Sequence, residues 1–154
     1  MTSLVIFDLF DNTVEGGIPS SISKLCNLQI LDLSSNNLSK SLPNFLEGTE
    51  NCMSRSPLAN LIHLRLSNNH LIGNLPEWLG QLVNLVELRL EYNLFKGPIL
   101  TTLGRLPLLE DLGLGGNELN GSLPDTLGQL SNLVSLDVSS NQLTGLVSEA
   151  HFSK

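Results

Sequence analysis

A few residues in this sequence belong to types that could do chemistry, but their spacing argues against a catalytic or metal site. They are the histidines His63, His70 and His151 and the acidic pairs Asp8/Asp11 and Glu87/Glu91. No histidine has a cysteine or carboxylate at metal-ligand spacing. Two carboxylates cleave glycosidic bonds only inside a cleft that raises the pKa of one of them, and an open arc of chain offers no such enclosure.

The glycine-rich stretch GLGGN at 113–117 is the remaining candidate. It lacks the third glycine and the Lys-Ser/Thr pair of a phosphate-binding loop. Its glycines predict instead a bare gap on one face of a strand. The sequence therefore predicts a protein that is not an enzyme and that needs no metal or cofactor.

Charged and aromatic side chains can also recognise another macromolecule. Arginine and tyrosine are favoured anchors of protein interfaces, and the middle of the chain combines them with carboxylates. The candidate binding residues are His63, Arg65, Glu87, Arg89, Glu91, Tyr92 and Asp111. The alternative is a solvated face whose charges only keep the surface soluble.

A repeat built around one asparagine positions these residues. The asparagines are Asn12, Asn36, Asn69, Asn93, Asn117 and Asn141. Four of the gaps between them are 24 residues and the other is 33. Apolar residues stand eight, five and three positions before each asparagine and two, six and ten positions after it, with His151 as the one departure. A fixed period of this length indicates a solenoid.

Each repeat is expected to form one coil. The alternation of apolar and polar residues before the asparagine predicts a short strand with one buried face. The buried amide of the asparagine must find backbone partners, so a ladder that links neighbouring coils is expected. Glycine four residues later permits backbone conformations closed to other residues, and Lys40 breaks this series. The following proline suits an edge-like stretch or the entry to a short helical turn.

These features predict an α/β solenoid of about six right-handed coils. A parallel β-sheet lines its concave face and short helical or 3₁₀ turns its convex face, and the candidate binding residues lie on the concave face. We expect one array over 1–154 without caps, so that it could self-associate through its ends. The expected coils are 4–27, 28–60 with an insertion at 47–57, 61–84, 85–108, 109–132 and a partial coil at 133–154.

The net charge and the lengths of the apolar runs argue against several classes of binding partner. The net charge is −7 and the isoelectric point about 4.7, which argues against nucleic acid and against an anionic membrane surface. No apolar run is long enough to span a bilayer. The N-terminal stretch 1–12 has no basic segment and contains two aspartates, so we expect a strand of the first coil rather than a signal peptide.

Two further features concern the cellular compartment. Cys26 and Cys52 could form a disulfide, which would imply an extracellular location, or they could remain free thiols. The sequence does not supply the Cα distance that decides between them. Asn37 and Asn120 each begin an Asn-x-Ser pattern on an exposed turn, where N-glycosylation is predicted.

The repeat unit also carries a family resemblance. The segments 61–82 (LIHLRLSNNHLIGNLPEWLGQL) and 109–130 (LEDLGLGGNELNGSLPDTLGQL) resemble the plant-specific class of leucine-rich repeat. Finer segments, such as LCNLQILDLSSNNLS and the end SEAHFSK, are similar to plant receptor-like proteins, nearest to receptors for fungal xylanase and to Cf-type resistance proteins.

This resemblance implies an ectodomain fragment of a glycosylated cell-surface receptor. Such a receptor binds a protein or peptide ligand, signals in defence or development through a partner receptor kinase, and has caps and a transmembrane helix outside the present chain. Two alternatives stay open at this point. One is a secreted inhibitor of fungal wall-degrading enzymes, similar to polygalacturonase-inhibiting proteins, and the other is a truncated copy without function.

Overall fold

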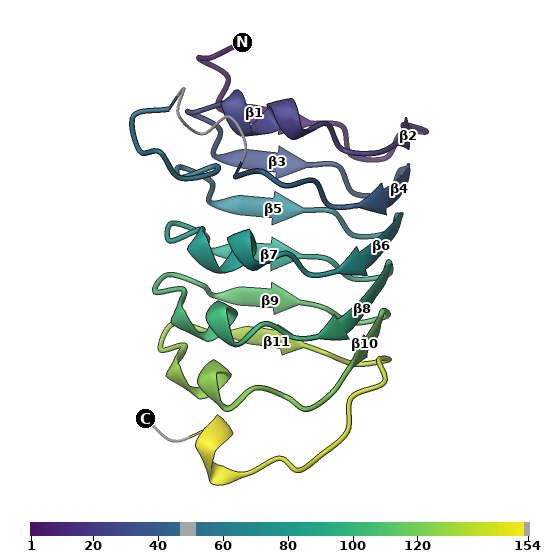
Figure 1. The fold of residues 1–154 in the computed structure, drawn as a ribbon, viewed down its shortest axis with the longest axis vertical. Coiled ribbons are helices and arrows are strands. Elements are labelled where there is room, and N and C mark those ends of the chain that lie inside the picture. Colours follow the sequence, from purple (N-terminus) through teal and green to yellow (C-terminus); the bar gives the residue numbers. More distant parts are fainter. Residues whose placement is uncertain (47–51, 153–154) are drawn as a thin grey trace.

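The computed structural model describes residues 1–46 and 52–152, so the expected insertion at 47–57 lies partly outside the described residues. The chain forms a stack of coils (Figure 1). Each coil has a strand on one side, and a second short strand follows at the turn of the first five coils. In the first, third, fourth, fifth and last coils, a 3₁₀ helix lies on the opposite side. The predicted leucine-rich solenoid is therefore confirmed.

A parallel sheet follows the first strand of each coil, in the order β1-β3-β5-β7-β9-β11. Its strands are β1 (Ile6–Asp8), β3 (Ile30–Asp32), β5 (His63–Arg65), β7 (Glu87–Arg89), β9 (Asp111–Gly113) and β11 (Ser135–Asp137). The strands pair without slippage, so that residues at the same repeat position are direct neighbours. The middle residue of each strand turns inward, and its neighbours face the concave side.

A second parallel sheet follows the asparagine turns, in the order β10-β8-β6-β4-β2. Its strands are β2 (Glu15–Gly16), β4 (Asn37–Ser41), β6 (His70–Asn74), β8 (Leu94–Pro98) and β10 (Glu118–Asn120). The sequence did not predict this sheet, because the glycine and proline nearby argue against a strand. The strands end before Pro76 and Pro124, so neither proline has to donate to the ladder.

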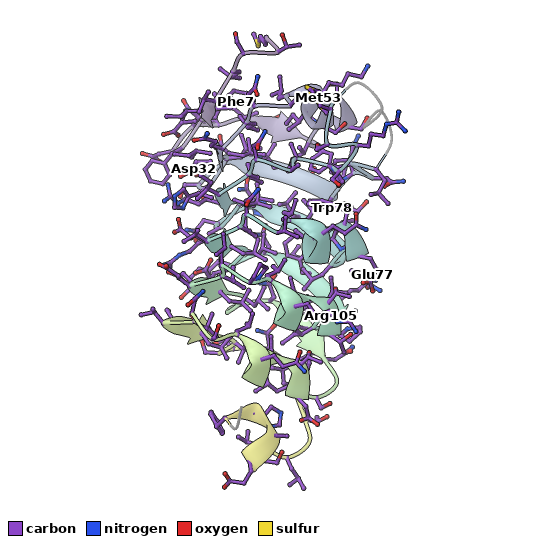
Figure 2. All side chains as sticks on the ribbon, turned by 90° about the vertical axis from the view of Figure 1, so that its left-hand side faces the viewer. Phe7, Asp32, Met53, Glu77, Trp78 and Arg105 are labelled. Carbon is purple, nitrogen blue, oxygen red and sulfur yellow. A yellow bond between two sulfur atoms is a disulfide. The ribbon has the colours of Figure 1, made fainter. Side chains whose placement is uncertain are left out.

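Short 3₁₀ helices form the convex side, as predicted. They are η1 (Ser20–Lys24), η3 (Glu77–Gln81), η4 (Thr101–Arg105), η5 (Asp125–Gln129) and η6 (Glu149–His151). Glycine lets neighbouring helices approach closely, since a Cβ at Gly104 would collide with the carbonyl oxygen of Thr126. Figure 2 shows the convex-side residues Glu77 and Arg105 at the opposite edge of the molecule from Asp32.

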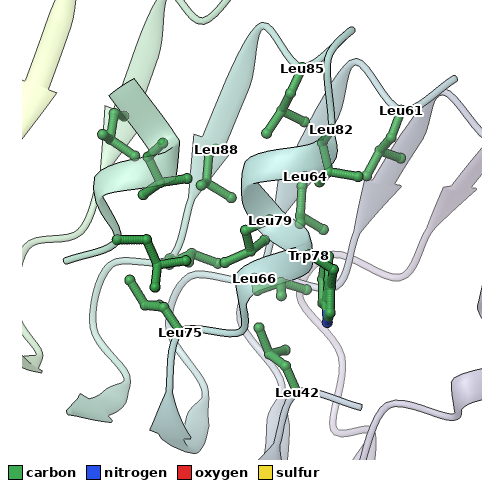
Figure 3. Close-up of a cluster of buried hydrophobic side chains, with 14 of the residues drawn as sticks. Leu42, Leu61, Leu64, Leu66, Leu75, Trp78, Leu79, Leu82, Leu85 and Leu88 are labelled. Atoms are coloured by element: carbon green, nitrogen blue, oxygen red, sulfur yellow. The ribbon is translucent and has the colours of Figure 1, made fainter. Parts of the chain in front are cut away.

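The core is a continuous row of leucines between the two sides (Figure 3). Trp78 closes its edge in the third coil. The indole ring packs against Phe45 with ring centroids 4.7 Å apart, and Nε1 donates a hydrogen bond of 3.0 Å to the carbonyl of Pro43. A buried indole needs such a partner for its N–H group, so Trp78 serves the core and is not a surface contact.

The side-chain amides of the repeat asparagines connect the coils. Nδ2 of Asn93 donates to the carbonyl of Leu66 in the preceding coil (3.0 Å) and to Leu90 in its own coil (3.2 Å). Its Oδ1 accepts the backbone N–H of Leu71 at 3.0 Å. The same pattern recurs at Asn36, Asn69, Asn117 and Asn141. Within the described residues, the side-chain amide of Asn12 donates only to carbonyls of its own coil.

A second amide ladder, which the sequence analysis missed, lies at the entry to the first strands. Asn60 donates to the carbonyl of Cys26 (2.7 Å), Asn84 to Ala59 (2.7 Å) and Asn132 to Pro107 (2.8 Å). These asparagines stand nine residues before the main ladder. The recurrence of asparagine at this repeat position was visible in the sequence, but leucine (Leu108) replaces it at the fifth coil.

The structure also shows whether the two cysteines pair and which backbone conformation Lys40 adopts. Cys26 and Cys52 form a disulfide with Cα atoms 5.4 Å apart, which ties Cys52 of the expected insertion to the end of the first coil. Lys40, which stands where other coils have glycine, has a φ of 79°. A left-handed conformation costs an ordinary residue about 1–2 kcal/mol, so the repeat imposes its backbone even on lysine.

The ladder gives a first prediction. Asn93→Ala leaves the N–H of Leu71 buried without an acceptor, so we expect the free energy of unfolding to fall by about 2–4 kcal/mol. Asn12→Ala is the matched control, because Asn12 is exposed and bridges no coils; its loss should stay below about 1 kcal/mol. Urea denaturation followed by circular dichroism measures both, and equal losses would contradict the role given to the ladder.

Candidate ligand-binding face

The concave sheet brings the candidate binding residues together. His63 in β5 pairs with Glu87 in β7, and Glu87 pairs with Asp111 in β9. Arg65 pairs with Arg89 in the adjacent column. Because neighbouring strands lie about 4.8 Å apart, the two guanidinium groups would repel each other unless carboxylates separate them.

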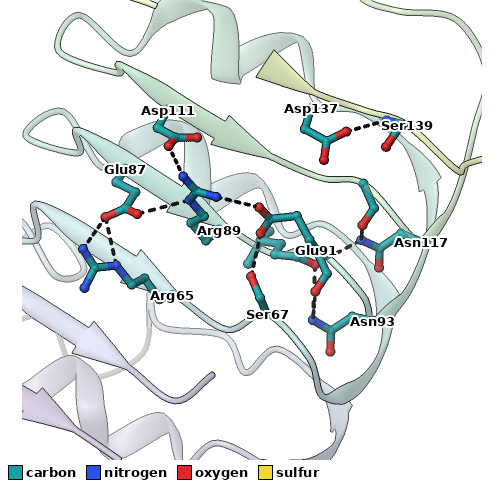
Figure 4. A network of polar contacts seen from close by, with 12 residues as sticks. Arg65, Ser67, Glu87, Arg89, Glu91, Asn93, Asp111, Asn117, Asp137 and Ser139 are labelled. Carbon is teal, nitrogen blue, oxygen red and sulfur yellow. Dashed lines mark hydrogen bonds and ion pairs between the residues drawn. The ribbon is translucent and has the colours of Figure 1, made fainter. Parts of the chain in front are cut away.

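Glu87 provides that separation (Figure 4). Its Oε2 accepts from Nε and Nη2 of Arg65 at 2.9 and 2.6 Å and from Nδ1 of His63 at 2.8 Å. Its Oε1 lies 3.2 Å from Nε of Arg89. Arg89 also donates from Nη1 to Glu91 at 3.2 Å and from Nη2 to Asp111. One network of ion pairs therefore covers three strands.

The network fixes the charge of its members. Burial acts to raise the pKa of Glu87, but the hydrogen bonds and charges of Arg65 and His63 outweigh burial and lower that pKa. The hydrogen bond to Glu87 raises the pKa of Arg65. Burial acts to lower the pKa of Arg89, yet Asp111 and Glu91 raise it overall. Glu87, Arg65 and Arg89 are thereby held in their charged forms.

The structure corrects two expectations about this face. Glu91 was expected as an exposed contact, but only 7% of it is accessible, because Oγ of Ser67 donates to its carboxylate at 2.5 Å. Gly113 and Gly115 do not leave a bare gap either. A Cβ at Gly113 would collide with the Glu91 carboxylate, and one at Gly115 would lie 2.8 Å from Oδ2 of Asp137. Neighbouring carboxylates fill the space.

Tyr92 is the residue that stands out. It is 63% exposed and has a φ of 55°. The residue before the ladder asparagine has a positive φ in every coil, and elsewhere it is Asp11, Ser35, Asn68, Gly116 or Ser140. A bulky side chain is a conformational outlier there. The ring of Tyr92 lies over Gly116 of the next coil, where a Cβ would stand 2.6 Å from Cδ1.

A groove of about 360 Å³ runs across the concave face. Its lining residues are Phe10, Asp32, Ser34, Ser35, Arg65, Ser67, Asn68, Glu87, Arg89, Glu91 and Tyr92. Phe10 is 56% exposed and, like Tyr92, offers an aromatic ring to solvent. The sequence analysis did not include Phe10 and Asp32 among its candidates, although they stand two and four residues before a ladder asparagine, as Ser67 and Arg65 do.

The other two histidines lie away from this groove. His70 is exposed at the start of β6. His151 is buried in η6, where Nε2 lies 3.0 Å from the carbonyl of Leu123 and Nδ1 accepts from the N–H of Ser148 at 3.0 Å. His151 thus fills the inward position that an apolar residue occupies in other coils.

Comparison with known proteins agrees with this architecture. A model of the leucine-rich repeat family matches residues 3–25, 27–49, 60–82, 108–130 and 132–152, more than half of the chain. The chain belongs to the leucine-rich repeat family. No curated protein sequence matches it.

Solved structures of plant receptor ectodomains share the fold. The ectodomain of the Arabidopsis thaliana receptor kinase GASSHO1/SCHENGEN3, in complex with CASPARIAN STRIP INTEGRITY FACTOR 2, is 35% identical with a TM-score of 0.86; the alignment covers 97% of this chain and 17% of that chain. The complex of the Arabidopsis receptor kinase HAESA with the peptide hormone IDA and the co-receptor SERK1 gives 38% identity and a TM-score of 0.86. The alignment covers 97% of this chain and 24% of that chain.

A shorter structure covers a similar part of the array. The Arabidopsis thaliana BIR3–SERK2 complex gives 36% identity and a TM-score of 0.73, with 90% of this chain and 68% of the matched chain covered. The present chain therefore spans a quarter or less of the two large receptor ectodomains. Within the described residues, no helix has the length and apolar character needed to cross a membrane.

The lowered pKa of Glu87 gives a second prediction. Its folded pKa lies below the ordinary value of 4.5, so its stabilising effect is present above that pH and is lost as the pH falls through the folded value. The free energy of unfolding should therefore decrease below about pH 4.5, and less steeply in Glu87→Gln. The control is Glu118→Gln, which removes an exposed carboxylate that has no ion pair within the described residues. Urea midpoints between pH 2.5 and 7 measure the slopes, and identical slopes for Glu87→Gln and the unmodified chain would contradict the prediction.

Proposed function

We propose that this chain is a ligand-recognition segment of a plant cell-surface receptor and is not catalytic. It binds a peptide or an exposed segment of a protein in the concave groove. The observation that carries this proposal is the exposed Tyr92, held in an unfavourable backbone conformation at the edge of that groove.

Backbone strain supports a role in binding. A residue in a sparsely populated conformation costs about 1–3 kcal/mol, and such residues cluster at functional sites. Serine, asparagine, aspartate and glycine occupy this position in the other coils, so the fold itself does not require tyrosine. An exposed tyrosine next to arginines has the composition of an interface anchor.

Similar structures support the class of ligand. They include the HAESA complex with the peptide hormone IDA, the PEPR1–AtPEP1 complex and the peptide hormone receptor RGFR1 with RGF2. The co-receptor SERK1 is also part of the HAESA complex. We therefore propose a peptide ligand and a co-receptor kinase as partners, in defence or developmental signalling. Within this class, the sequence resemblance favours receptor-like proteins similar to the xylanase receptors and Cf-type proteins.

The chemistry of the surface supports an extracellular location. A disulfide such as Cys26–Cys52 persists in oxidising compartments. Asn37 and Asn120 are exposed, on the second sheet rather than in the groove. We propose that both carry N-linked glycans, which would leave the concave face free. Mass spectrometry of the chain secreted from plant cells tests this, and unmodified Asn37 and Asn120 peptides would refute it.

The main test uses Tyr92→Ser, a substitution that other coils carry naturally. We expect unchanged or raised stability, because serine relieves steric strain. The affinity for peptides selected from a random display library on the chain should fall about 30-fold, since truncating an aromatic anchor costs about 2 kcal/mol or more. Gln81→Ala on the convex side is the control and should bind normally. The proposal would be contradicted if the affinity of the selected peptides were the same for Tyr92→Ser and the unmodified chain.

A further inference from the structure

The arginines of the groove are already engaged, and this restricts the charge of a ligand. All three side-chain nitrogens of Arg89 have carboxylate partners, in Glu87, Glu91 and Asp111. Arg65 donates from two nitrogens to Glu87, and its third lies 3.6 Å from Asp32. An anionic ligand group would have to displace these partners and leave buried carboxylates unpaired, which is costly. The arginines therefore hold the face together rather than capture an acid.

Carboxylates remain in excess after this pairing. The concave positions carry Asp8, Asp32, Glu87, Glu91, Asp111 and Asp137, against Arg65 and Arg89. Asp137 has no ion pair in the part of the chain that the structure describes; its carboxylate accepts hydrogen bonds from Ser139, including one from the backbone N–H to Oδ1 at 2.9 Å (Figure 4). It lies on β11, two strands beyond β7, the strand that Tyr92 follows. A ligand cation that reached Asp137 would meet an unpaired carboxylate beside an acidic surface.

Two exposed aromatic rings define the spacing along the groove. Phe10 follows β1 and Tyr92 follows β7, and β3 and β5 lie between those strands. Three strand spacings of about 4.8 Å place the two coils about 14 Å apart. An extended peptide advances about 3.3 Å per residue, so side chains about four residues apart reach both rings. Ser35 and Asn68 line the groove between them and offer polar groups to a peptide backbone.

We propose that the groove selects an extended cationic peptide with two apolar side chains four positions apart. One apolar side chain packs on Phe10 and the other on Tyr92. A lysine or arginine beyond the Tyr92 anchor pairs with Asp137. This inference rests on the proposed peptide-binding function and adds the chemical class of the peptide.

The test compares three synthetic nine-residue peptides by fluorescence polarisation with the complete chain. The first has leucines at positions 2 and 6 and lysine at position 8. The second replaces lysine by glutamate, and the third moves the leucine at position 6 to position 4. We expect the first to bind at least about tenfold more tightly than either other peptide, because the glutamate peptide places like charges together and the third peptide loses an aromatic contact.

Chain variants locate the contacts. Asp137→Asn keeps an acceptor for Ser139 and should remove the preference for lysine over glutamate. Phe10→Ser introduces the residue that Ser34 and Ser67 represent at the same repeat position, and it should remove the preference for spacing. Glu118→Gln, on the second sheet, should change neither.

The outcomes separate the two proposals. Tyr92-dependent binding that prefers the glutamate peptide, or that ignores the leucine spacing, would overturn the ligand class and leave the recognition function standing. The proposed ligand class would also be overturned if none of the three peptides bound while library peptides without a basic residue bound through Tyr92. The absence of any Tyr92-dependent peptide in that library would remove both proposals together.

Discussion

The side-chain amide at each asparagine turn is the interaction on which the solenoid depends. A coil that reverses direction leaves backbone N–H and carbonyl groups without partners, and buried groups of this kind must be paired. Asn93 meets this need in two coils at once, since it donates to Leu66 and Leu90 and accepts from Leu71. An amide that joins adjacent coils also fixes their separation. The unslipped pairing of the concave strands follows from the same repeat.

That pairing determines the electrostatics of the concave face. Residues at equal repeat positions become neighbours, so Arg65 and Arg89 stand side by side whatever their charges. Glu87 can contact both because it occupies the adjacent column. The arginines consequently belong to a structural network, although their residue type is typical of binding anchors. We propose that the ligand instead contacts the exposed rings of Phe10 and Tyr92 and the carboxylate of Asp137, which has no ion pair within the described residues.

The sequence predicted the solenoid, its concave sheet, the 3₁₀ turns and the main ladder, because each rests on a pattern repeated in six coils. It did not predict the second sheet, whose strands are short and contain or adjoin glycine and proline. It predicted an exposed Glu91 and an empty space at Gly113, and both predictions were wrong. A single sequence does not show that one side chain fills the space above another strand. Side chains that cross between coils are therefore the part of the site that needed the structure.

Tyr92 illustrates how such a repeat can acquire a function. The ladder asparagine fixes the backbone of the residue before it, and all six coils show a positive φ there. A small or polar residue accepts this conformation at little cost, whereas a tyrosine adds strain. The same geometry makes the ring project over Gly116, which has no side chain to obstruct it. The repeat thus fixes the backbone from which the ring projects, and this preorganisation would favour binding of the proposed ligand.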